Sequence, residues 1–571
     1  MSYFKNYEKI KSFLLRAYRL INNPSLYYLY VWCFFVLYFI LTFMTLDRVF
    51  GMDDQFFHIR FAELLRRNGV NIFTNFQSIY FSKMGIIKEY FVYYNFLFYL
   101  ILIPFTFISP LVVGMKLYGV FAIATSFLVV YVFFKKISIK KPFNYTVFFL
   151  FALLQSGWLF RFTVARPFAL APAFLVAMLY FIHKKKYFIT AMIAFIYFYW
   201  HTATFIFPFC LSVGYFIFEQ FYGKKPDWKL IIWSFSGTFG AVSLAYLMSP
   251  GIVLYLKDVI FPVFFDTSLI KSTGISEGSE VYGKDLVAMS AIFFLFFATL
   301  AIAGSYEILR YVQSKKDFQK NEDVIDMTIQ PLRGMLFMAS IVFFAATALS
   351  ARFLDYFVFF CWLYVVIAFN DLKKFLEIKG ALFRKSLRIS LFIILSFLFV
   401  NMSFNFYDLL ASGNSQLVTR GTAEWLNLNV AKGKIIFNVD WDSFPTLYYF
   451  SGDKFRYVVG LEPRFLYDLN HELYWEWRNI GNGIYCKSND CTELIKYRQA
   501  MKGDAKKQWD KQQGDLIAEA ILIDFKTDIV VVSNGRSDLL ETMNNSNRFK
   551  KEFFDDKNSS YAIYRVIAKT N

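Results

Sequence analysis

Long apolar runs separated by short polar segments fill the first two-thirds of the chain. Tyr27–Leu46, Leu111–Phe134 and Leu230–Met248 are three of these runs, and each carries almost no charge. A helix of about 20 apolar residues is long enough to cross the hydrocarbon core of a bilayer. The pattern therefore predicts a polytopic α-helical membrane protein.

Clusters of lysine and arginine between the runs predict which helix ends face the cytoplasm. They lie at the N-terminus and at 135–141, 184–186, 224–229, 315–320 and 373–388. Counting the runs between the clusters predicts about eleven transmembrane helices, with the N-terminus in the cytoplasm and the C-terminus outside. These helices are expected near 25–48, 111–134, 144–160, 168–182, 187–200, 204–219, 230–248, 286–308, 334–349, 353–369 and 388–403. If Phe91–Ile108 were a further span, the lysines at 135–141 would lie outside the membrane. We therefore expect this run to be a re-entrant or interfacial segment on the outer face.

The last third of the chain has a different pattern. Short apolar runs at Ile435–Val439, Asp528–Ser533 and Tyr561–Val566 are typical of strands, and the polar stretch Glu493–Asp515 is typical of a helix. The sequence therefore predicts two domains, a transmembrane domain over 1–403 and an external soluble mixed α/β domain over 404–571.

Composition agrees with this division. The chain is 57% hydrophobic and 22% aromatic, well above the apolar content of ordinary globular proteins. The formal charge of +18 lies in short clusters between apolar runs rather than on one basic face, so we interpret it as topology and expect no nucleic-acid partner. Cys486 and Cys491 form either a disulfide, which requires an oxidising compartment, or two free thiols.

The first external loop opens with two adjacent carboxylates, Asp53 and Asp54, followed by His58 and Arg60. In one interpretation an aspartate holds a divalent cation or acts as a general base, with His58 and Arg60 one turn further on as substrate ligands. In the other, the acids cap the N-terminus of an amphipathic helix. Spacing alone leaves both open.

External turns after later helices carry further polar residues. Arg161 and Arg166 lie where positive charge is not expected, and they bind either a phosphate-linked substrate or lipid headgroups. His201, beside Trp200 at a helix end, either contacts substrate or is simply interfacial.

Two later segments offer charged groups on the same side. Glu277 lies in the glycine-rich stretch 273–280, which is either a mobile lid or a plain polar loop. Arg352 follows the outer end of a helix, and it binds either a phosphate or Asp355 one turn later.

The C-terminal domain adds Trp441 and Asp442, directly after a predicted strand. Tyrosines and tryptophans crowd the residues that follow. They either bind a sugar or peptide, or pack this domain onto the membrane part. No Walker loop, HExxH, GxSxG or paired CxxC motif occurs, so soluble-nucleotide chemistry is not indicated.

Together these motifs resemble the GT-C superfamily of membrane glycosyltransferases, and most closely the catalytic subunit of oligosaccharyltransferase. The resemblance spans nearly the whole chain. It rests on the acidic motif with its aromatic-His-x-Arg continuation, the Gly-Ile-Ser-Glu segment of the external loop, the late arginine and the Trp-Asp motif. These are Asp53, Asp54, Phe57, His58, Arg60, Gly274, Ile275, Ser276, Glu277, Arg352, Trp441 and Asp442.

The resemblance implies a role for each matching position. Asp53 or Asp54 would hold a divalent metal, Mg or Mn, and the acceptor. Glu277 would reach the site from its loop, and Arg352 would contact the donor phosphate. Trp441 and Asp442 would contact the acceptor.

The chain also departs from the family pattern. Oligosaccharyltransferases carry an acidic pair in the second external turn that completes the metal site, whereas this chain has Arg161 and Arg166 there and no carboxylate. The Trp-Trp-Asp-Tyr-Gly motif of the family reads Asp-Trp-Asp-Ser-Phe over 440–444. Metal dependence and an asparagine acceptor therefore both stay open.

The sequence predicts an integral protein of the cell membrane that transfers a sugar, with inversion, from a polyprenyl phosphate or pyrophosphate donor to a glycan, lipid or protein acceptor on the outer face. Asp53 or Asp54 would be base or metal ligand, and Arg166 and Arg352 would neutralise the leaving phosphate. One alternative is a transporter or flippase of an anionic lipid-linked sugar. Another is a non-catalytic membrane scaffold that displays the external domain.

Overall fold

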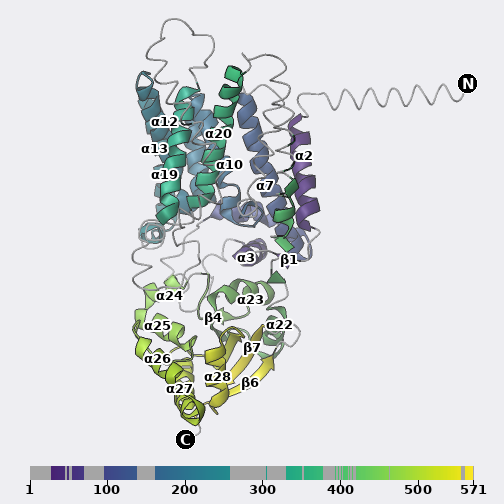
Figure 1. Cartoon of the computed structure of the whole chain (residues 1–571), viewed down its shortest axis with the longest axis vertical. Coiled ribbons are helices and arrows are strands. Elements are labelled where there is room, and N and C mark those ends of the chain that lie inside the picture. The colour runs from purple at the N-terminus through teal and green to yellow at the C-terminus, as the bar shows by residue number, and fades with distance from the viewer. Residues whose placement is uncertain are drawn as a thin grey trace, which may run out of the picture.

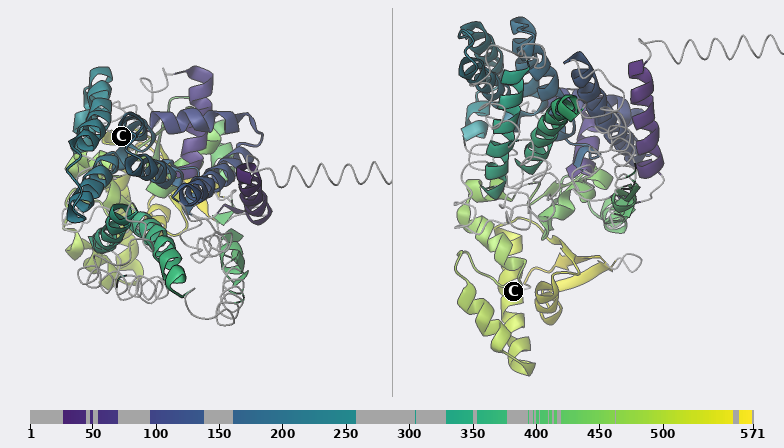
Figure 2. Two further views of the ribbon diagram at one scale, coloured as in Figure 1. Left: turned by 90° about the horizontal axis from the view of Figure 1, so that it is seen from above. Right: turned by 45° about the horizontal axis from the view of Figure 1, so that its top comes forward.

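The computed structural model describes most of the helical part and nearly all of the C-terminal domain. The described residues are 27–44, 48–49, 54–69, 95–137, 161–257, 304, 329–349, 353–376, scattered positions between 393 and 415, 419–461, 463–554 and 560–569. They form a bundle of apolar helices above a domain built around a mixed sheet (Figure 1). The right-hand view of Figure 2 shows the same two layers after a turn of 45°.

Four of the described helices are long and apolar enough to cross a membrane. They are α7 (Leu111–Lys136), α12 (Phe207–Phe221, extended by η5, Thr202–Thr204), α13 (Trp228–Met248) and α19 (Gln330–Leu349). Other apolar helices of the bundle are α2 (Tyr27–Phe39), α10 (Ala171–His183), α11 (Tyr187–Trp200) and α20 (Leu354–Leu376). Helices thus occur at eight of the predicted spans.

The spans expected at 144–160 and 286–308, and most of 388–403, lie outside the described residues, so the total of eleven stays a prediction. The described part of the run at 91–108 contains a short segment, α6 (Phe96–Leu102) followed by η3 (Ile103–Phe107). Such a segment is only about 18 Å long and does not reach across a bilayer.

Helix α3 (Asp54–Asn68) lies between the bundle and the sheet domain (Figure 1). Asp54 occupies its first turn and Arg66 and Arg67 its last, the charge order that the helix dipole favours. Phe56 contacts Tyr449, and Phe57 contacts Tyr448 of the C-terminal domain. One hydrophobic core therefore runs from the membrane helices through α3 into the soluble domain.

The C-terminal domain contains a five-stranded sheet in the order β4-β3-β5-β7-β6. The strands are β3 (Ile435–Asn438), β4 (Arg456–Tyr457), β5 (Ile529–Ser533), β6 (Phe549–Phe554) and β7 (Tyr561–Val566). β3 pairs in parallel with β4 and β5, whereas β7 pairs antiparallel with β5 and β6. The mixed sheet and the three strands expected from the sequence are confirmed.

Helices accompany the sheet. They are α22 (Arg420–Asn429), η8 (Trp441–Ser443), α23 (Phe444–Ser451), α24 (Arg464–Leu469), α25 (His471–Ile480), α26 (Thr492–Ala500), α27 (Gly503–Ile523) and α28 (Ser537–Asn545). The polar stretch predicted as one helix forms α26 and α27, which are separated by Met501 and Lys502; α27 begins at Gly503, a residue with φ of +62°. The domain boundary at 403/404 stays a prediction.

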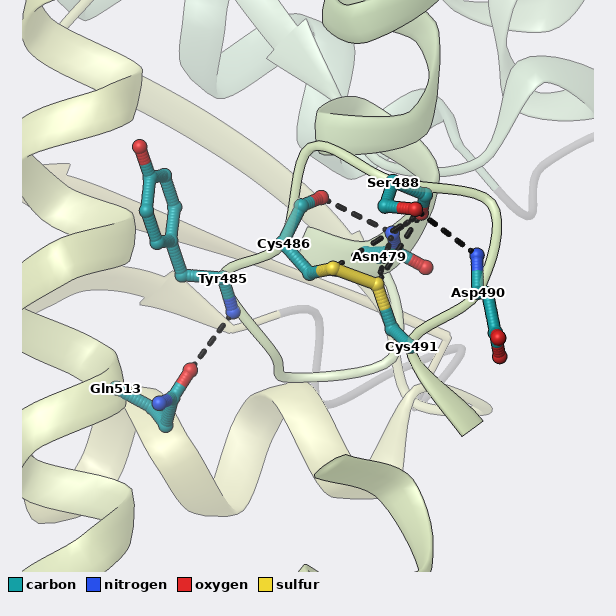
Figure 3. The surroundings of a disulfide bond; sticks show 7 residues. All are labelled: Asn479, Tyr485, Cys486, Ser488, Asp490, Cys491 and Gln513. Atoms are coloured by element: carbon teal, nitrogen blue, oxygen red, sulfur yellow. Dashed lines mark hydrogen bonds between the residues drawn. A yellow bond between two sulfur atoms is a disulfide. The ribbon is translucent and has the colours of Figure 1, made fainter. Parts of the chain in front are cut away.

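Cys486 and Cys491 are joined by a disulfide in the loop between α25 and α26 (Figure 3). The side-chain amide of Asn479 donates to the carbonyl oxygens of Cys486 and Ser488, at 3.0 and 2.9 Å. The Tyr485 N–H donates to Gln513 Oε1 at 2.8 Å. The disulfide and these bonds fix the loop against α25 and α27.

Candidate functional site

The first turn of α3 meets the segment 161–169 through an ion pair. Arg166 Nη2 lies 2.8 Å from Asp54 Oδ2. The two side chains are 20% and 25% exposed, so both remain accessible from outside the protein. Two groups that the sequence singled out separately, the acidic motif and an external arginine, therefore form one site.

A second ion pair joins the same segment to helix α20. Arg161 Nε lies 2.8 and 3.0 Å from the two carboxylate oxygens of Asp355. The ring of Phe168 lies near both arginines, with its centre 5.1 Å from the guanidinium carbon of Arg161 and 5.3 Å from that of Arg166. Asp355, which the sequence offered as a partner for Arg352, thus binds Arg161.

Hydrogen bonds hold the arginine segment in place. The indole N–H of Trp200 donates to Pro167 O at 2.7 Å, and the Ser126 hydroxyl donates to Ala169 O at 3.1 Å. Both donors are buried and belong to the helices α11 and α7. Arg166 therefore projects from a backbone that the bundle fixes on two sides.

His58 lies one turn along α3 from Asp54 and is buried. Its Nδ1 is 2.9 Å from the hydroxyl of Tyr99 on α6. Burial, with the nearby positive charge of Arg166, lowers the pKa of His58 to about 3. The imidazole is therefore neutral at physiological pH, so it acts here through a hydrogen bond rather than as a cation.

His201 ends helix α11 directly after Trp200 and is half-buried. Its Nδ1 is 2.7 Å from Thr204 Oγ1 and 3.3 Å from the hydroxyl of Tyr356. Tyr197 also bonds Thr204, at 2.8 Å. This network ties α11 to α20 beside the arginine segment.

Arg60 lies on the side of α3 that faces the C-terminal domain. It forms an ion pair with Glu63, and Glu63 also binds Arg67. A Cβ atom at Gly452 would come within 2.7 Å of Arg60 Nη2, so the two parts of the protein meet closely here. The described contacts of Arg60 are structural, and its role as a substrate ligand stays a prediction.

Trp441 and Asp442 form η8, immediately before α23. Phe444, at the start of α23, contacts Phe57 of α3, whereas Trp441 packs against the core of the C-terminal domain. Burial and the neighbouring charge of Asp440 raise the pKa of Asp442. Asp440 itself binds Arg536 at 2.7 Å.

The structure places four of the aromatic residues that follow the Trp-Asp motif. Tyr448 and Tyr449 pack against α3, whereas Tyr457 and Tyr474 are fully buried inside the C-terminal domain. Packing of the domain onto the membrane part therefore accounts for Tyr448 and Tyr449, whereas Tyr457 and Tyr474 are core residues.

Asp53, Glu277 and Arg352 lie outside the described residues. Among the residues that are described, no group of three or more His, Cys, Asp or Glu side chains is placed to hold a metal ion. At Asp54 a guanidinium lies against the carboxylate oxygen where a metal ion would bind. The described side chains around Asp54 therefore do not fit a divalent-metal site.

Sequence reasoning overlooked Tyr99, the hydrogen-bond partner of His58, and Lys116. The available signal for Lys116 was its charge, because it is the only charged residue between Leu111 and Phe134. It is 4% exposed in the structure. No comparable signal distinguished Tyr99 from the other tyrosines.

Among solved structures, the chain is similar to the cryo-EM structure of the arabinofuranosyltransferase AftD from mycobacteria, with a TM-score of 0.50 at 11% sequence identity. The likeness covers 96% of this chain and 40% of AftD, so the chain spans less than half the length of that protein. At this identity the likeness shows the fold. No protein-family model and no curated protein matches the chain.

Proposed function

We propose that the protein is a membrane glycosyltransferase that moves a sugar from a polyprenyl phosphate or pyrophosphate donor to an acceptor on the outer membrane face. The observation that carries the proposal is the accessible Asp54–Arg166 ion pair at the junction of the helical bundle and the soluble domain. The fold shared with an arabinofuranosyltransferase supports the same class of activity.

The carboxylates and arginines of the proposed site support the following reaction. A hydroxyl or amide of the acceptor attacks the anomeric carbon, and Asp53 or Asp54 takes the proton that the acceptor loses. The bond between that carbon and the phosphate oxygen breaks, and its electron pair leaves with the polyprenyl phosphate. Arg166 offsets the negative charge that develops on the leaving group, and Arg352 has the same role. Attack opposite to the leaving oxygen inverts the anomeric configuration.

The remaining predicted residues take supporting roles in this proposal. Glu277 reaches the site from its external loop, and His201 with Arg161 lines the donor side. Trp441 and Asp442 approach from the soluble domain and contact a glycan, lipid or protein acceptor.

The outer face is proposed because the disulfide between Cys486 and Cys491 is compatible with an oxidising compartment. Basic residues also lie at the C-terminal ends of α7 and α10, whereas Arg166 lies before the N-terminal end of α10. A lipid-linked donor suits that face, since the bilayer delivers it directly to a site at the interface.

A transporter or flippase would need charged residues deep within the helices along a path. In the described apolar helices of the bundle, every charged residue lies within six residues of a helix end. This distribution favours chemistry at the interface.

The experiment that tests the proposal measures transfer from a radiolabelled polyprenyl-linked sugar pool in membranes. The wild type is compared with Asp53→Ala plus Asp54→Ala, and with Asp504→Ala, an exposed aspartate of α27, as the control. We expect the double variant to lose transfer by about 10²-fold or more and the control to keep it. Normal transfer by the double variant would reject the site, and no transfer by the wild type would reject the function.

A further inference from the structure

Lys116 is a buried charge near one end of a membrane helix. It is the sixth residue of α7, about 8 Å along the axis from the first residue. Its 4% exposure means that the ammonium group has left bulk water, which is costly unless the surroundings supply negative charge or polar partners. A charge in such a place is a candidate for function.

The position of Lys116 on α7 directs it toward the candidate site. Residues three and four apart share a helix face, so Lys116 lies on the same face as Val112 and Gly119. Gly119 packs directly against the carbonyl oxygen of Thr163, three residues before Arg166.

The same face continues to Ser126, whose hydroxyl donates to Ala169 O at the end of the arginine segment. Lys116 therefore lies on the face of α7 that follows the arginine segment, one turn before the contact between Gly119 and Thr163. Helix α3, which carries Asp54, also contacts α7.

A further positive charge at the site would help it to bind a phosphate. Arg166 is paired with Asp54, and Arg161 with Asp355, so each arginine already faces one carboxylate. A phosphate brings further negative charge, and an ammonium group with three N–H donors can bind it while keeping a protein partner.

We propose that Lys116 is a phosphate-binding residue of this site, and that Lys116 and Arg166 supply as fixed side-chain charge what a divalent metal ion would otherwise supply. The phosphate is that of the lipid-linked sugar donor, and in this respect the inference rests on the proposed function. Binding of phosphate by the protein tests the inference separately from sugar transfer.

The test uses the purified full-length chain in detergent and a short-chain polyprenyl monophosphate as the probe. Tryptophan fluorescence reports binding, with and without chelator. Lys116→Met is compared with Lys136→Met, a matched lysine at the exposed opposite end of the same helix. We expect Lys116→Met to weaken binding about 10- to 100-fold, Lys136→Met to leave it unchanged, and chelator to have no effect.

Two further arms identify the source of the phosphate and guard against misfolding. Phosphatidylglycerol and inorganic phosphate are added as competitors, and equal competition by either would overturn the assignment to a lipid-linked donor. Lys116→Arg, which keeps the charge, should restore most of the binding that Lys116→Gln loses. If Lys116→Gln binds as tightly as the wild type, or if chelator abolishes wild-type binding, the inference is wrong.

Discussion

Two arginine–aspartate pairs in this protein have nearly the same geometry and different surroundings. Arg166 and Asp54 lie 2.8 Å apart and are 20% and 25% exposed. Arg498 and Asp510 lie 2.9 Å apart and are 4% and 0% exposed. Arg498 also binds Asp538 and Glu541, so that one guanidinium connects the three helices α26, α27 and α28.

The comparison contrasts a structural ion pair with the pair that we propose to be functional. Arg498 and Asp510 are enclosed by their own domain, and the Arg498 cluster holds three helices together. The Arg166 pair lies at a junction between two domains and keeps part of each side chain accessible. Burial and accessibility, rather than the bond itself, therefore distinguish the two roles.

Removing the buried arginine should have the largest effect on stability. Arg498→Met leaves Asp510 as a buried carboxylate without its arginine, and we expect the free energy of unfolding to fall by about 3–5 kcal/mol. Thermal unfolding of the purified full-length chain measures this change. Arg420→Met, which removes an exposed i,i+4 pair with Glu424, is the control and should cost about 0.5 kcal/mol or less. Equal effects of the two variants would contradict the assignment of Arg498 as a structural clamp.

Removing the accessible arginine should give the opposite result. Arg166→Gln should reduce sugar transfer about 100-fold, because the leaving phosphate loses a fixed positive charge. Its stability should change by about 1 kcal/mol or less, since the pair is partly exposed. Transfer in membranes and thermal unfolding are measured on the same preparations. A large loss of stability together with normal transfer would show that the Arg166–Asp54 pair is structural.

A smaller effect is expected at Glu476, a buried carboxyl of α25 near Asp524 and Lys487. Burial, followed by the neighbouring Asp524, raises the pKa of Glu476 to about 7. Because the folded pKa lies above the unfolded value, the stability that this group contributes is complete below the unfolded pKa. It is then lost as the pH rises toward about 7.

Glu476→Gln should therefore remove this dependence and raise stability above pH 7 by about 1–2 kcal/mol, while Lys487 keeps Asp524 as a partner at 2.8 Å. Thermal unfolding between pH 5 and pH 8 provides the measurement. A variant that is less stable than the wild type at pH 8 would show that the Glu476–Lys487 attraction outweighs the cost of burying the carboxylate.

Local pattern was sufficient to predict much of the fold. The apolar runs at 435–439 and 528–533 became β3 and β5, and the amphipathic stretch after Asp54 became α3. β4 was missed because it has only two residues. β6 was missed because Phe549–Phe554 places lysines and a glutamate at an exposed edge and has no clear alternation.

The site residues were recognisable one by one, but their pairing was not. The sequence indicated Asp54 and Arg166 separately, and nothing local connects two residues so far apart along the chain. It also gave no sign that Arg161 binds Asp355, and the pairing it suggested between Arg352 and Asp355 lies outside the described residues. Such contacts depend on how helices pack, which local periodicity does not encode.

Exchanging the two charges of the accessible pair tests the central claim most directly. In the variant with Asp54→Arg and Arg166→Asp the ion pair can form again, but the acid and the cation have changed places. Transfer is measured from the radiolabelled polyprenyl-linked sugar pool, beside each single variant. If the pair belongs to the reacting site, the exchange restores stability and leaves transfer at the level of the single variants. If the exchange restores transfer to the wild-type rate, the pair is structural and the proposed site is wrong.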